Sequence, residues 1–181
     1  MHFKPLQFNN VESITHTLFN HYQHLLSKNS LYAEAVDRQT IEQLVPDLVS
    51  QFDSIGCTWD IARIFITPPN DVLDVHIDGD NNYPKHTAIN WPLANCEQST
   101  MTWYNILDLN NFFYPDRSQF YGSSRIKFYN ADNCQALESV TIDQPYLVRI
   151  DVPHGITNHS DKPRMMLSFR FKPEPLHLWS D

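Results

Sequence analysis

The chain contains 181 residues, of which 41% are hydrophobic and 13% aromatic, and it carries a formal net charge of -8 at pH 7. This composition indicates a globular protein whose length fits a single domain over residues 1–181, with enough residues to bury a sizeable core. The negative charge argues against nucleic acid as a partner, and no stretch is long and apolar enough to span a bilayer.

The first residues and the cysteines indicate the compartment. Residues 1–7 lack the apolar stretch of a secretory signal peptide, so we expect a cytoplasmic protein. Cys57, Cys96 and Cys134 are widely spaced and form no Cys-x-x-Cys pair. This spacing argues against both a disulfide framework and a zinc ribbon.

Two helical segments are predicted near the start of the chain. Apolar residues recur at three- and four-residue spacing over residues 11–27, and Asn10 is placed to cap that helix. A second helical segment begins at Thr40, where Thr40 and Gln43 match a capping box. Pro46 interrupts this segment, so we expect a kink or two short helices there.

From residue 57 onward the sequence consists of short strand-like runs separated by Pro, Asn, Asp and Gly. Eight strands suffice for a jelly roll of two facing sheets, the double-stranded β-helix of cupin-like proteins. We therefore expect a mainly β fold in which residues 1–56 form a helical support, residues 57–172 the jelly roll and residues 173–181 a tail. The predicted strands are 59–67, 72–78, 86–93, 100–106, 125–130, 136–142, 146–152 and 164–172.

A His-x-Asp pair, His76 and Asp78, lies in the second of these strands. Successive side chains of a strand point to opposite faces, so these two share one face, with Cα atoms about 6–7 Å apart. One metal ion could bind both, and such a pair with a later histidine is the facial triad of non-haem iron(II) oxygenases. The alternative is a solvent-exposed strand face, because the motif also arises by chance.

Three predicted strands have one polar face and one apolar face. Such alternation usually means that the polar face lies in solvent. Here the N-terminal helices would cover the outer face, which then has to be apolar, so the polar face would line the interior and form a site. The polar faces contain Asp74, His76 and Asp78, opposite Leu73, Val75 and Ile77; then His86, Ala88 and Asn90; and finally Arg164, Met166, Ser168 and Arg170.

Two later histidines are candidates for the third metal ligand. His154 follows the predicted strand over residues 146–152 and precedes a glycine, whereas His159 lies in a polar turn. We favour His154, because a ligand beside a rigid element keeps its geometry better than a ligand in a loop. Arg164 is ten residues further on and offers a planar fork of N–H donors for a carboxylate.

This order of residues resembles the iron(II)/2-oxoglutarate-dependent dioxygenases. The superfamily pattern is His-x-Asp, a later His and then Arg or Lys, which His76, Asp78, His154 and Arg164 match in turn. The resemblance covers about residues 59–172 and leaves the N-terminal helices unmatched.

Two branches of the superfamily are similar to parts of this chain. The segment from His154 to Arg164 and the run from His86 to Pro92 resemble the aspartyl/asparaginyl β-hydroxylases. Some members of that branch lack the acidic ligand that Asp78 supplies here. Prolyl hydroxylases of the collagen type have lysine in place of Arg164, so the sequence assigns neither branch.

The resemblance implies cofactors and a role for each residue. Fe(II) would be held by His76, Asp78 and His154, with 2-oxoglutarate chelating the iron, pairing with Arg164 and reacting with O2. His86 would help to hold the cosubstrate, and Arg170 would support the same end of the cavity or form an outer ion pair. Asn90 and Trp103 are further candidates for lining the substrate cavity, with core packing as the alternative for Trp103.

The resemblance further implies a hydroxylase that acts on an amino-acid side chain in a protein, a peptide or a small molecule. One alternative is a non-catalytic jelly-roll module in which the triad is degenerate or holds a structural metal. Another is a cupin oxygenase that uses iron without 2-oxoglutarate. Arg164 favours the dioxygenase over these alternatives, because a cupin that only binds a metal does not need an arginine to bind a carboxylate after its last ligand.

Overall fold

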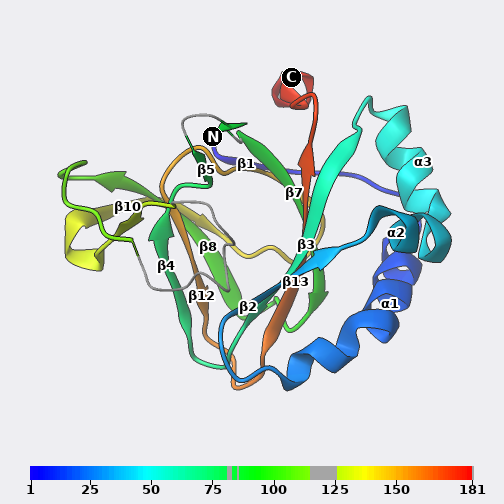
Figure 1. Ribbon diagram of the computed structural model, residues 1–181, viewed down its shortest axis with the longest axis horizontal. Helices are drawn as coiled ribbons and strands as arrows, with labels where there is room; N and C mark the ends of the chain where they lie inside the picture. Colours follow the sequence, from blue (N-terminus) through cyan, green and yellow to red (C-terminus); the bar gives the residue numbers. More distant parts are fainter. Residues whose placement is uncertain (81–82, 85, 115–125, 181) are drawn as a thin grey trace.

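Two antiparallel sheets form the body of the protein in a computed structural model, which describes residues 1–80, 83–84, 86–114 and 126–180 (Figure 1). The six-stranded sheet has, in order, β1 (Phe3–Pro5), β11 (Tyr146–Arg149), β7 (Thr87–Ala94), β13 (Arg164–Phe171), β3 (Trp59–Thr67) and β2 (Tyr32–Val36). The five-stranded sheet has β10 (Cys134–Val140), β8 (Ser99–Ile106), β12 (His154–Asn158), β4 (Val72–His76) and β9 (Phe128–Tyr129). A short hairpin pairs β5 (Gly79–Asp80) with β6 (Tyr83–Pro84).

The chain crosses between the two sheets repeatedly. From β3 it passes to β4 in the smaller sheet, returns to β7, crosses to β8, and later runs β11, β12, β13 with a change of sheet at each step. Side chains from both sheets meet in one interior cluster, which includes Leu73, Met101, Val148 and Met166. The predicted jelly roll, a double-stranded β-helix, is therefore confirmed.

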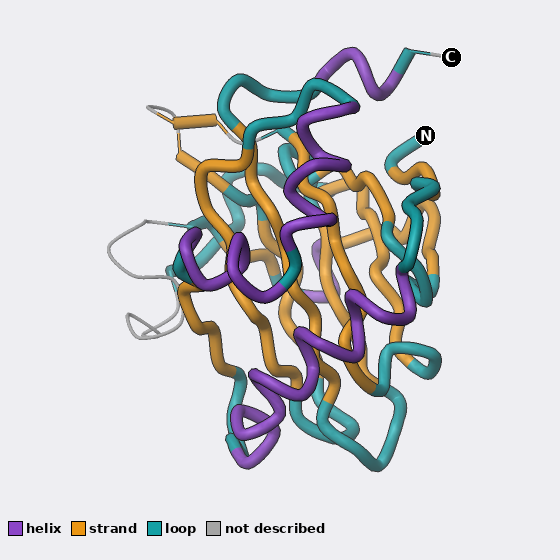
Figure 2. The backbone as a smooth tube through the Cα atoms, turned by 90° about the vertical axis from the view of Figure 1, so that its right-hand side faces the viewer, coloured by secondary structure: helices purple, strands orange, loops and turns teal. Residues whose placement is uncertain are grey.

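Helices cover the outer face of the six-stranded sheet (Figure 2). They are α1 (Val11–Tyr22), the 3₁₀ turn η1 (Gln23–Ser27), α2 (Arg38–Leu44) and α3 (Pro46–Ser54), while η2 (Ala131–Asn133) and η3 (Leu176–Trp179) are single turns elsewhere. None of the helices in the described residues is long and apolar enough to cross a membrane.

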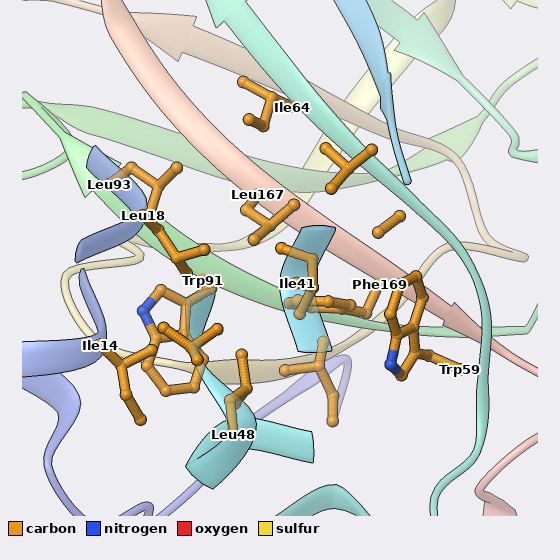
Figure 3. Close-up of a cluster of buried hydrophobic side chains, with 14 of the residues drawn as sticks. Ile14, Leu18, Ile41, Leu48, Trp59, Ile64, Trp91, Leu93, Leu167 and Phe169 are labelled. Carbon is orange, nitrogen blue, oxygen red and sulfur yellow. The ribbon is translucent and has the colours of Figure 1, made fainter. Parts of the chain in front are cut away.

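The apolar face of β13 packs under these helices. Leu167 and Phe169 are fully buried in one cluster with Leu18, Ile41 and Leu48 of the three helices (Figure 3). Burial of each such side chain contributes about 1.5–3 kcal/mol, so the helices are held mainly by this face. The expected polarity of the sheet is confirmed: its apolar face is outside, under helices, and the polar face of β13 points between the sheets.

The helix boundaries differ from the prediction in detail. The segment predicted as one helix over 11–27 consists of α1, which ends at Tyr22, and the tighter 3₁₀ turn η1 that follows it. Asn10 precedes α1 in a left-handed conformation, and among the described residues its side chain forms no capping hydrogen bond. The second segment is capped by Asp37, whose carboxylate accepts a 2.9 Å hydrogen bond from the Thr40 amide, so the predicted start at Thr40 is wrong. The predicted break at Pro46 is confirmed, because α3 starts there.

All eight predicted strands overlap strands of the structure, although residue 125 of the range 125–130 lies outside the described residues. The prediction missed β1 and β2, so residues 1–56 supply two edge strands as well as helices. It also missed β12, which begins at His154. A Cβ atom on Gly155 would lie 3.2 Å from the carbonyl oxygen of Leu73, so glycine permits the close approach of β12 to β4.

Candidate metal centre

A β-bulge in β4 sets the direction of His76. Ile156 of β12 lies opposite Leu73, and His154 lies opposite His76, so the single intervening residue of β12, Gly155, faces two residues of β4, Asp74 and Val75. The extra residue reverses the alternation of side chains. Leu73 and His76 therefore both face the interior, whereas Val75 packs in a separate cluster on the other side. The expectation that Leu73 lies opposite His76 is wrong for this reason.

His76, Asp78 and His154 meet at one point. Their candidate ligand atoms all lie within 4.8 Å of one another, and Nε2 of His76 is 3.2 Å from Oδ1 of Asp78. Both histidines are 3% exposed. His159 is exposed beyond the end of β12 and does not belong to this group. Two histidines on strands and one carboxylate two residues beyond the end of β4 form a donor set suited to a divalent transition metal.

The backbone fixes the orientation of both histidines. Nδ1 of His76 is 2.8 Å from the Asp74 carbonyl oxygen, and Nδ1 of His154 is 2.9 Å from that of Val152. A carbonyl oxygen only accepts hydrogen bonds, so each Nδ1 carries the proton and each Nε2 keeps the lone pair that a metal requires. Burial, and next the adjacent His76, lower the pKa of His154 to about 4, which keeps this ring neutral at pH 7.

Arg170 holds the outer oxygen of Asp78. Its Nη2 donates a 2.6 Å hydrogen bond to Oδ2 of Asp78, and its Nη1 donates to Oγ of Ser168, which in turn bonds to Oδ1 of Asn90. Burial alone would raise the pKa of Asp78, but the Arg170 guanidinium and the nearby histidines outweigh it and hold that pKa well below its usual value. Oδ1 is the oxygen left facing the histidines.

Arg164 is a buried cation at the start of β13. Its side chain is 3% exposed, and Nε donates a 3.0 Å hydrogen bond to Oγ of Ser99, whose hydroxyl donates to the Cys96 carbonyl oxygen at 2.8 Å. Burial lowers the pKa of Arg164. Among the described residues, no carboxylate forms an ion pair with it. An unpaired buried charge costs several kcal/mol, so this position is suited to an anion that the protein chain does not supply.

The register between strands gives the separation between the histidine–aspartate–histidine cluster and Arg164. On β8, Trp103 pairs with His154 and Ser99 pairs with Asn158, four residues further along β12. At about 3.3 Å per residue, Ser99, which binds Arg164, lies roughly 13 Å along the strands from His154. The long Arg164 side chain spans part of that distance. β13 is an inner strand of the six-stranded sheet and β12 an inner strand of the five-stranded sheet (Figure 1), and both the histidine cluster and Arg164 face the space between the two sheets.

No family model and no curated protein sequence matches this chain. Several solved structures do match it. They include a Pseudomonas putida prolyl-4-hydroxylase (TM-score 0.50, 11% identity, 94% of this chain and 91% of that one) and HygX from Streptomyces hygroscopicus with nickel and 2-oxoglutarate bound (0.50, 11%, 93% and 81%). A Trichoplax adhaerens prolyl hydroxylase in complex with a hypoxia-inducible-factor peptide also matches (0.53, 14%, 99% and 87%). The chain has the fold of the iron(II)/2-oxoglutarate-dependent oxygenases.

Within this oxygenase fold, the remaining predicted residues lie in different places. Arg170 lies at the metal end, six residues along β13 from Arg164, so it does not support the same end as Arg164 but forms the ion pair expected as its alternative role, with Asp78. Asn90 faces the interior and bonds to Ser168. Trp103 is fully buried, donates a 2.8 Å hydrogen bond to the Arg149 carbonyl oxygen and stacks on Phe3, which is core packing.

Sequence reasoning did not single out three residues that complete this arrangement. The sequence identified Ser168 only as one residue of the polar face of β13. It gave no reason to select Ser99, which is a single polar residue at the start of a strand. Asp151 follows β11 and lies 3.0 Å from Nδ1 of His86. Each acts on a partner more than sixty residues away in sequence, which no local pattern records.

Proposed function

We propose that this protein is an iron(II)- and 2-oxoglutarate-dependent oxygenase that hydroxylates an amino-acid side chain. The observation that carries the proposal is Arg164, a fully buried guanidinium without a carboxylate partner among the described residues, in the same interior as a histidine–aspartate–histidine cluster. A bound metal would account for the histidine–aspartate–histidine cluster but would leave the Arg164 charge without a counter-ion. A dicarboxylate that binds the metal at one end and Arg164 at the other accounts for both features.

Iron(II) fits the residues at the cluster. Nε2 of His76, Nε2 of His154 and Oδ1 of Asp78 would hold it, because the backbone carbonyls and Arg170 already occupy the other polar atoms of these side chains. Three protein ligands leave three positions of an octahedral ion for 2-oxoglutarate and O2. When bound, the iron and its cosubstrate supply the oxidising power that inserts oxygen into a C–H bond, and 2-oxoglutarate leaves as succinate and CO2.

Arg164 would bind the far carboxylate of 2-oxoglutarate. Ser99 accepts from Nε and the Cys96 side chain lies against the same guanidinium, whose remaining N–H groups would form a bidentate pair with that carboxylate. The buried position strengthens the pair, because there is little water to compete for the charges. The roughly 13 Å offset along the strands, shortened by the arginine side chain, suits a five-carbon dicarboxylate that also reaches the metal.

Anaerobic addition of iron(II) and 2-oxoglutarate to the metal-free protein tests the proposal. We expect a weak visible charge-transfer band, followed by succinate formation when air is admitted. Iron binding without a band or succinate would instead support a cupin oxygenase that does not use 2-oxoglutarate. Failure to bind iron would support a non-catalytic jelly-roll module.

The substrate is proposed to be a peptide, a protein or a small molecule. Both kinds occur among the similar structures: the Trichoplax adhaerens enzyme holds a peptide fragment, and the epimerase SnoN, similar at 12% identity and a TM-score of 0.54, holds nogalamycin RO. Single-domain organisation, a cytoplasmic location and the absence of a nucleic-acid partner stay predictions from composition.

A further inference from the structure

His86 faces the interior at the metal end of the barrel. The Ile150 amide donates a 3.0 Å hydrogen bond to the His86 carbonyl oxygen, which extends the β7–β11 ladder by one pair beyond Thr87. Ile150 belongs to the interior cluster, and residues opposite each other in a ladder point to the same side of a sheet. His86 therefore points into the barrel.

The same end of the barrel carries Arg170 and Asp78. Ala88, two residues along β7 from His86, lies opposite Arg170 on β13, and Arg170 bonds to Asp78. The Asp78 amide also donates a 3.0 Å hydrogen bond to the Ile150 carbonyl oxygen. His86, on the other side of Ile150, is thus at the rim of the candidate metal centre, and its side chain is 40% exposed, which leaves it accessible from solvent.

The His86 ring is held by charged neighbours. Nδ1 lies 3.0 Å from Oδ2 of Asp151, and Arg149 donates to the same carboxylate from Nε at 2.7 Å and from Nη2 at 2.5 Å. The Arg149 guanidinium lies 6.0 Å from the Trp179 ring of the C-terminal turn η3. An ionised carboxylate only accepts hydrogen bonds, so Nδ1 carries a proton, and in the neutral ring this tautomer has its lone pair on Nε2, on the side away from Asp151.

His86 is distant from the cation that would hold the cosubstrate. Met165, next to Arg164 in β13, pairs with Ala94, eight residues along β7 from His86. At about 3.3 Å per residue this separation is roughly 26 Å, which is beyond the combined reach of the two side chains. His86 and Arg164 are therefore not placed to bind the same carboxylate of the cosubstrate.

We propose that His86 is a substrate-contacting residue whose Nε2 accepts a hydrogen bond from a hydroxyl or amide N–H of the substrate at the rim of the metal centre. This inference rests on the proposed function, because it takes the metal end of the barrel as the place of reaction. The substrate class is then a molecule with a hydrogen-bond donor close to the carbon that is hydroxylated, such as a peptide or an amino-acid amide. Asp151 and Arg149 are positioning residues that keep Nε2 available.

Nitrogen NMR of the full chain with ¹⁵N-labelled histidine tests the inference, with zinc(II) replacing iron so that the sample is diamagnetic and inert. The His86 signals are assigned from the spectrum of His86→Gln, and exposed His159, assigned with His159→Gln, is the internal control. We expect the Nδ1-protonated tautomer for His86, and Asp151→Leu, which removes the acceptor, should remove that preference. Binding of 2-oxoglutarate, measured by calorimetry, should leave the His86 Nε2 signal in place.

Two small amides then probe the acceptor. N-methylacetamide has one N–H donor and N,N-dimethylacetamide has none, so only the first should shift the His86 Nε2 signal, with His159 unchanged. Equal responses to both amides, no response to either, or a His86 shift on addition of 2-oxoglutarate would overturn the inference. If zinc and 2-oxoglutarate do not bind at all, the proposed function fails instead, and the calorimetry distinguishes these cases.

Discussion

Arg170 donates a 2.6 Å hydrogen bond to Oδ2 of Asp78 across the interior, from the six-stranded sheet to the end of β4 in the other sheet. Both side chains are largely buried, at 13% and 16% exposure. Removing one partner of such a pair leaves the other charge uncompensated, at a cost of about 3–5 kcal/mol. We therefore expect Arg170→Met to lower the unfolding free energy of the metal-free protein by that amount, measured by urea denaturation at pH 7.

Two variants control this experiment. Arg170→Met combined with Asp78→Asn should recover part of the loss, because the remaining carboxamide carries no charge. Glu42→Gln removes an exposed pair with Arg38 and should change stability by less than about 0.5 kcal/mol. A loss for Arg170→Met as small as for Glu42→Gln would show that the Asp78 carboxylate does not need Arg170.

Arg164→Met should have opposite effects on stability and on cosubstrate binding. The buried guanidinium has no carboxylate partner among the described residues, so replacing it with an apolar side chain should raise the unfolding free energy of the ligand-free protein by about 1–3 kcal/mol. The affinity for 2-oxoglutarate should fall by about 100-fold, from loss of roughly 3 kcal/mol of charged hydrogen bonding. Calorimetry with the iron(II) or zinc(II) protein measures this change.

Lys172→Met provides the matched comparison, because Lys172 is an exposed cation just beyond the end of β13. It should leave 2-oxoglutarate affinity unchanged. Metal affinity should stay the same in both variants, since neither residue belongs to the triad. An unaltered 2-oxoglutarate affinity in Arg164→Met would refute the role assigned to this arginine.

Asp78→Ala should abolish specific metal binding. It removes one of three ligands and leaves Arg170 facing the two histidines, so the loss should exceed the 10- to 100-fold that is usual for residues behind the ligands. His159→Ala should bind metal as the unchanged protein does, because His159 is exposed and outside the triad. Equal losses in the two variants would mean that the metal site lies elsewhere.

Gly155→Ala should destabilise the fold without adding or removing a polar group. The new Cβ would lie 3.2 Å from the Leu73 carbonyl oxygen and 3.6 Å from Cε2 of Tyr104, so β12 and β4 have to separate slightly. Overpacking of this kind costs about 1–3 kcal/mol. Thr157→Ala in the same strand should cost less, and thermal unfolding of the two variants measures the difference.

The ion pair of Asp151 should make stability depend on pH. Burial opposes ionisation, but Arg149 and His86 outweigh it and lower the pKa of Asp151 in the folded state. A lowered folded pKa stabilises the protein at pH values above the unfolded pKa of about 4, and that contribution is lost as the pH falls through the folded value. Asp151→Asn should therefore be less stable than the unchanged protein at pH 7, and the gap should close towards pH 3. A gap that is the same at both pH values would contradict the assignment.

The sequence by itself determined the strands and the chemical character of their faces. Alternation along residues 164–171 predicted an apolar side under helices and a polar side within the barrel, because side-chain direction in a strand follows from position alone. The His-x-Asp spacing of His76 and Asp78 and the carboxylate fork of Arg164 were visible for the same local reason.

Only the tertiary structure decided how these faces meet. The bulge that turns Leu73 and His76 to one side arises in the pairing of β4 with β12, and neither strand records it alone. Pairing across the barrel likewise decided that Arg170 serves Asp78, that Ser99 orients Arg164, and that His86 lies at the opposite end from Arg164. The register between strands depends on contacts between residues that are distant in sequence. Local periodicity therefore identifies candidate residues of this site but not the residues with which they form hydrogen bonds and ion pairs.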